Sequence, residues 1–137
     1  MSYDLYLATY DRGKRWDDGS PKPYHWSFLI RTCSPGGETH QLHGMPGAYY
    51  YQGAEKNTEM EESSAVKAKM EIGTVDHNTL DKFQEACNTI SIEKREYIKW
   101  NCQNWALEAL DELRKVGGVD IWYENDAIKN WFREQEH

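Results

Sequence analysis

The stretch from Cys102 to Lys115 carries the helical periodicity that most constrains the fold of this chain. Its apolar side chains recur every three or four positions and form one stripe along a helix: Trp105, Ala106, Ala109, Leu110 and Leu113. Gly117 and Gly118 follow this stretch and fit the end of a helix. A helix with a single apolar stripe packs against another layer, and the first half of the chain supplies that layer.

The first half of the chain has the pattern of an antiparallel sheet. Residues 3–10 alternate and are rich in β-forming side chains, which predicts a strand. A strong turn signal at 33–37 separates the apolar residues 24–32 from residues 39–43, which predicts a hairpin. The aromatic run 48–52 predicts a third strand or an extension of the hairpin.

The second half of the chain predicts one further strand and more helices. Residues 66–75 favour a strand, and residues 79–88 and 124–134 favour helices beside the one that begins at Cys102. The acidic segment 53–64 predicts an exposed loop, with a lid over a cleft as its functional alternative. These patterns predict an α+β fold in which an antiparallel sheet packs against helices.

Composition limits the classes of function. A chain of 137 residues suits one domain over residues 1–137, and 16 basic against 23 acidic residues give a net charge of -7. That sign opposes phosphate, so we expect no DNA partner and no anionic membrane surface. We see no apolar leader and no apolar run of about 18 residues, so we expect a cytoplasmic protein without a membrane anchor. A mature secreted form is the alternative.

The cysteines and histidines do not have the spacing of a metal site. Cys33, Cys87 and Cys102 are odd in number and widely separated, which fits neither a disulfide framework nor a zinc site. No histidine pair has the i, i+4 spacing of helical ligands. We therefore expect a reducing setting, no metal and no cofactor.

Cys102 is the residue of greatest chemical interest. The positive end of a helix and its unpaired N–H groups stabilise a thiolate, which is the nucleophilic form of cysteine. His25 begins the apolar strand upstream and, held across a cleft, would complete a Cys-His nucleophile pair. The structural alternative is that Cys102 only packs in the core and His25 only binds a neighbouring loop.

Three short motifs carry a resemblance to a known group of enzymes. His25-Trp26, His43-Gly44-Met45-Pro46 and Asn101-Cys102 resemble, in order and placement, the circularly permuted papain-like superfamily, which includes NlpC/P60 relatives, LRAT-like acyltransferases and PPPDE peptidases. The chain departs from the LRAT-like pattern after the cysteine, where Gln103-Asn104-Trp105 replaces "EHF". Gly73-Thr74-Val75-Asp76 is similar to a motif of a small, uncharacterised fungal branch.

The resemblance implies a thiol hydrolase or acyltransferase that acts on an amide, ester or thioester. Cys102 would attack the acyl carbon, and His25 would take the thiol proton and later protonate the leaving group. His43 would orient His25 as the third catalytic residue, with His40 as its rival. Strand alternation puts residues 40 and 43 on opposite faces, so at most one of them faces His25.

Two further residues complete the predicted site. Gln103, together with the backbone N–H of Cys102, would form the oxyanion site, and Trp26 would line the cleft.

Two other functions compete with this one. The same fold could serve as a non-catalytic binding module. A biosynthetic transferase could instead form a new amide from an acyl or aminoacyl donor, as in cyclodipeptide synthesis. The expected partner is a small-molecule, peptide or acyl substrate, and the oligomeric state stays open.

Overall fold

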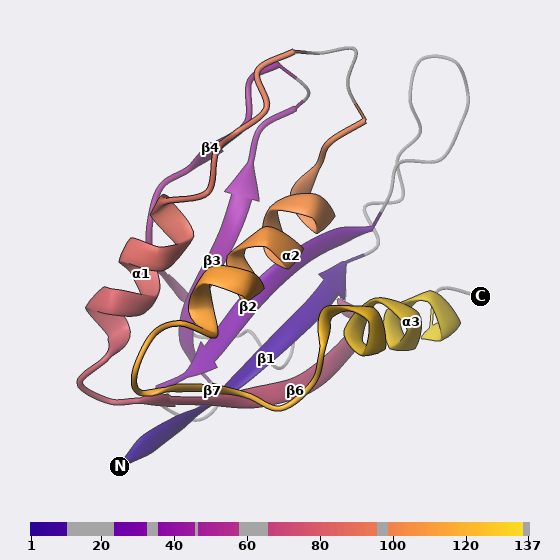
Figure 1. Ribbon diagram of the computed structural model, residues 1–137. Coiled ribbons are helices and arrows are strands. Elements are labelled where there is room, and N and C mark those ends of the chain that lie inside the picture. Colours follow the sequence, from indigo (N-terminus) through magenta and orange to yellow (C-terminus); the bar gives the residue numbers. More distant parts are fainter. Residues whose placement is uncertain (11–23, 33–35, 46, 58–65, 96–98, 136–137) are drawn as a thin grey trace.

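Three helices pack on one face of a curled antiparallel sheet (Figure 1). The structure, a computed structural model, describes residues 1–10, 24–32, 36–45, 47–57, 66–95 and 99–135. The elements follow in the order β1 (Ser2–Tyr10), β2 (His25–Arg31), β3 (Gly37–His43), β4 (Tyr50–Tyr51), β5 (Glu55–Asn57), β6 (Val66–Asp76), α1 (Leu80–Asn88), α2 (Cys102–Leu113), β7 (Val119–Ile121) and α3 (Asn125–Gln135). The predicted single α+β domain with helices packed against an antiparallel sheet is confirmed.

The strand order across the sheet is β4-β3-β2-β1-β6-β7, and β5 also pairs with β3. The strand β1 is central: Leu7 lies opposite Phe28 of β2 and opposite Met70 of β6. The short strands β5 and β7 differ from expectation, because β5 lies in the acidic segment predicted as a loop and β7 was not predicted. Each contains three residues, too few for a visible alternation.

The outer edge of β3 carries β4 and β5 as one interrupted strand. Leu42 lies opposite Tyr51, whereas Thr39 lies opposite Glu55. The four residues from Thr39 to Leu42 thus face the five residues from Tyr51 to Glu55, and this one extra residue is the count of a β-bulge. Gly53 lies in this bulge with φ +87, a conformation that favours glycine. The bulge puts the Glu55 side chain on the same sheet face as Thr39.

The two faces of the sheet bury different clusters. The main core lies between the sheet and the helices, where the Phe28 ring meets Phe83 of α1 at 5.9 Å and Trp105 of α2 at 6.0 Å. The opposite face holds a smaller cluster made of Tyr6, Ala8 and Leu29. Since side chains alternate along a strand, this register decides which polar residues lie together.

Candidate active site

A capping box fixes the start of α2. The Asn101 side chain accepts a hydrogen bond from the Gln103 backbone N–H at 2.9 Å, and the Asn101 N–H donates to Oδ1 of Asn104 at 3.0 Å. These bonds satisfy two backbone donors at the helix start and make Cys102 the first helical residue, as predicted. The helix dipole therefore acts directly at the cysteine.

The start of α2 is tied to the residue that precedes β2. Cys102 Sγ donates to the carbonyl oxygen of Tyr24 at 3.8 Å, and Gln103 Nε2 donates to the same oxygen at 3.0 Å. The structure therefore brings Cys102 beside the backbone that leads into His25. It also gives the Gln103 side chain a hydrogen-bond partner within the fold, and its oxyanion role stays a prediction.

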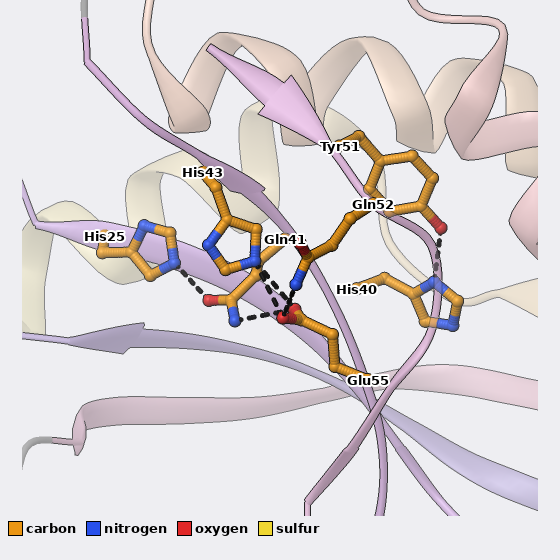
Figure 2. Close-up of polar contacts among 7 residues, drawn as sticks. All are labelled: His25, His40, Gln41, His43, Tyr51, Gln52 and Glu55. Carbon is orange, nitrogen blue, oxygen red and sulfur yellow. Dashed lines mark hydrogen bonds and ion pairs between the residues drawn. The ribbon is translucent and has the colours of Figure 1, made fainter.

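His25 lies on the sheet face opposite the helices. It pairs with Tyr10 across β1 and β2, and the two rings are 6.0 Å apart. Its side chain is 8% exposed. His25 Nε2 lies 2.6 Å from Oε1 of Gln41 (Figure 2). Because an amide oxygen only accepts, Nε2 carries the proton, and the neutral ring has its lone pair on Nδ1.

Glu55 is the centre of a polar cluster on this face, which we call the Glu55 cluster. Its carboxylate accepts hydrogen bonds from Gln41 Nε2 at 3.0 Å, from His43 Nε2 at 2.9 Å and from Gln52 Nε2 at 2.5 Å (Figure 2). Partial burial raises the pKa of Glu55, but these hydrogen bonds outweigh it and leave the pKa below its ordinary value. The cluster is therefore built around an ionised carboxylate.

The third position beside His25 is held by Gln41. His43 bonds to Glu55 and stacks on Tyr50 with ring centroids 5.3 Å apart, so it reaches His25 only through Glu55 and Gln41. The structure thus places an amide where the sequence predicted His43.

His40 lies on the other face of the sheet. Its Nδ1 is 2.6 Å from the Tyr51 hydroxyl, and its ring packs against Phe83 at 4.8 Å. The predicted separation of His40 and His43 onto opposite faces is therefore confirmed, and neither contacts His25. Burial raises the pKa of Cys87 to about 12, although a hydrogen bond with Tyr51 lowers it, so that thiol is a poor nucleophile.

Trp26 is a core residue. Its side chain is 2% exposed and its ring packs against Phe132 of α3 at 5.2 Å. It supports the start of β2 from the helix side, in the place of the expected role as a cleft lining. Cys33 and residues 58–64 of the predicted loop lie outside the described residues.

The described residues contain neither a recognisable metal site nor a membrane-spanning helix. Among those residues, no group of three or more His, Cys, Asp or Glu side chains is arranged to hold a metal ion. None of the described helices is long and apolar enough to cross a membrane.

Three residues of the Glu55 cluster escaped prediction: Gln41, Gln52 and Glu55. Gln41 lies two positions before His43, and strand alternation alone would have placed both on one face. Glu55 gave no signal, because it stands in a polar segment whose pairing depends on the bulge at Gly53.

The chain described above matches the model of a protein family. A single α+β domain with a curled antiparallel half-barrel defines the class. The chain belongs to DUF6540, a family of unknown function, whose model matches residues 5–120. That range includes Cys102, His25 and the whole Glu55 cluster. No curated protein and no solved structure matches the chain.

Proposed function

We propose that this protein is a cysteine-dependent hydrolase or acyltransferase with a permuted papain-like arrangement. One observation carries the proposal. His25 Nε2 is held by the amide oxygen of Gln41, while the start of α2 fixes Cys102 to the carbonyl oxygen of the residue before His25. A cysteine, a histidine and an amide are the three groups of a papain-like site.

Cys102 is the nucleophile in this proposal. It is the first residue of α2, where the helix dipole lowers the free energy of the thiolate relative to the thiol. The capping box of Asn101 holds the helix start in place. The backbone N–H groups of the first turn also offer donors for a developing oxyanion.

His25 is the general base. The Gln41 amide oxygen keeps the proton on Nε2, so the lone pair of the neutral ring is on Nδ1. Nδ1 is the ring nitrogen bonded to Cγ, and the proposal requires it to face the Cys102 sulfur. This tautomer is the one that can accept the thiol proton there.

The reaction balances with these groups. His25 takes the proton of Cys102, and the thiolate attacks the acyl carbon of an amide, ester or thioester. The tetrahedral intermediate expels the amine, alcohol or thiol, which receives the proton from His25. Water or another nucleophile then attacks the acyl-enzyme, loses its proton to His25 and releases Cys102. Water makes the protein a hydrolase, and another acceptor makes it a transferase.

A binding module is the second candidate, and it also has an observation in its favour. Cys102 is only 6% exposed, and its sulfur donates to a carbonyl as a structural thiol does. The side chains of Met45 and Tyr50 are exposed apolar surface, and the Tyr50 ring stacks on His43. In this function the Glu55 cluster would shape a recognition face.

Alkylation separates the two functions. We expect iodoacetamide near neutral pH to modify Cys102 about tenfold or more faster than Cys87, whose raised pKa makes it an internal control. The substitution His25→Ala should slow this reaction, and Cys102→Ser should abolish the modified peptide. Equal alkylation rates for Cys102 and Cys87 in the native protein would exclude the proposed enzymatic function. Varying the acceptor after trapping the acyl-enzyme then separates hydrolysis from transfer.

A further inference from the structure

The orientation of the Gln41 amide decides which nitrogen of His25 carries the proton. With Oε1 toward His25, the amide accepts from Nε2–H, as the structure has it. Rotated by half a turn, the amide would instead present its NH₂ group, which requires the lone pair on Nε2 and the proton on Nδ1. Only the first arrangement leaves Nδ1 able to act as a base.

The amide alone does not choose between these arrangements. Its oxygen and its NH₂ group have nearly the same shape, so the choice comes from what lies on its far side. In this protein the far side is a carboxylate: Gln41 Nε2 donates to Glu55 Oε2 at 3.0 Å. An ionised carboxylate accepts and cannot donate, so it pairs only with the NH₂ group.

The cluster keeps Glu55 ionised and in place. His43 Nε2 lies 2.9 Å from each carboxylate oxygen, and Gln52 Nε2 also donates to the carboxylate. A histidine nitrogen and two amides therefore face it with donors. The Glu55 side chain is 24% exposed, and the bulge at Gly53 presents it to the same face as Gln41.

We propose that Glu55 is a positioning residue that selects the Nε2–H tautomer of His25 through the amide of Gln41. The catalytic consequence of this selection rests on the proposed function, whereas the selection itself does not. Glu55 touches neither Cys102 nor the reacting atoms in this scheme, and it acts only through Gln41.

Nitrogen NMR of the imidazole tests the proposal directly. The tautomer of His25 is read at about pH 8, where an ordinary histidine is neutral, and its signals are assigned by their loss in His25→Ala. We expect Glu55→Gln, which keeps the shape but can donate as well as accept, to raise the ratio of Nδ1–H to Nε2–H at least about fivefold, the factor that one net hydrogen bond supplies. The control Glu71→Gln, at an exposed site on β6, should leave the ratio unchanged.

A second background shows whether the effect passes through Gln41. In Gln41→Leu the amide is absent, so adding Glu55→Gln should not change the tautomer ratio further. An unchanged ratio in folded Glu55→Gln would overturn the proposal. A shift of equal size in both backgrounds would also overturn it, because Glu55 would then act on His25 by another route.

The outcome is distinguishable from a failure of the proposed function. If Cys102 shows no enhanced alkylation but the ratio shifts as expected, the positioning role stands and the thiol chemistry falls. If alkylation is enhanced and the ratio does not shift, the positioning role falls alone. Should Glu55→Gln fail to fold, Glu55→Ala is the substitute, because it removes the carboxylate that accepts from Gln41 Nε2 and should raise the ratio in the same direction.

Discussion

Gln103 Nε2 donates to the carbonyl oxygen of Tyr24 at 3.0 Å, which joins the first turn of α2 to the residue before β2. These two residues are far apart in the sequence, and the bond fixes how the helix start meets the sheet. The Cys102 sulfur shares the same acceptor at 3.8 Å. Any chemistry at the thiol therefore depends on this contact between the first turn of α2 and Tyr24.

The hydrogen bond from Gln103 to Tyr24 predicts that Gln103→Ala destabilises the protein. The substitution removes one partly buried hydrogen bond, so the free energy of unfolding should fall by about 0.5–1.5 kcal/mol. Urea denaturation measures the change. The control is Gln135→Ala at the exposed end of α3, which should change stability by less than about 0.5 kcal/mol. An equal loss for both variants would mean that the bond to Tyr24 contributes nothing.

Tyr51→Phe should destabilise the protein through His40. The Tyr51 hydroxyl is the hydrogen-bond partner of Nδ1 of His40, whose side chain is 0% exposed. Removing the hydroxyl leaves a buried polar atom without that partner, which costs about 1–3 kcal/mol. Thermal or chemical unfolding gives the number. Tyr50→Phe is the matched control because Tyr50 is 51% exposed, and a similar loss there would refute this account.

Cys87 predicts a loss of stability at alkaline pH. Burial raises the pKa of its thiol to about 12, while in the unfolded chain it returns to about 8.5. Above pH 8.5 or so the unfolded chain binds fewer protons than the folded one, so the free energy of unfolding falls as pH rises toward 12. Cys87→Ala should remove this part of the slope between about pH 9 and pH 11. The same slope in both proteins would assign it to other groups.

The lowered pKa of Glu55 predicts that the protein loses stability in acid. Its pKa lies below the ordinary value, so the ionised form contributes stability above the ordinary carboxyl pKa of about 4.3. That contribution is lost as pH falls through the lowered pKa of the folded state. The difference in unfolding free energy between wild type and Glu55→Gln should therefore shrink between about pH 6 and pH 3. A difference that is constant with pH would show that the charge of Glu55 is not involved.

Much of the fold follows from patterns that are local in the sequence. The stripe of α2, with Asn101 as its cap, and the alternation of β1 to β3 predicted the helix and the hairpin at nearly their observed bounds. Hydrophobic periodicity carries this information because one buried face repeats many times within each element.

The site was predicted less completely, for a physical reason. The placement of Cys102 at a helix start and of His25 at a strand start needed only local signals. The neighbour of His25 Nε2 depends on the register between β2 and β3, in which Ser27 lies opposite Gln41. The local patterns of the two strands do not determine that register, which depends on how the strands pair.

The position of Glu55 was harder still to predict from local sequence patterns. Its position depends on the pairing of a three-residue strand across a bulge, and no periodicity marks either. The long-range pairing rather than the local propensity decides its face.

The bulge between Tyr51 and Glu55 has a consequence for comparing members of the family. It accommodates one extra residue without changing the pairing on either side. Tyr51 pairs with Leu42, and Glu55 pairs with Thr39. A relative that lacks one residue between these two positions would form an uninterrupted strand with the same pairs. Alignments of DUF6540 proteins should therefore place a one-residue gap at Gln52–Ala54 and keep the columns of Tyr51 and Glu55 intact.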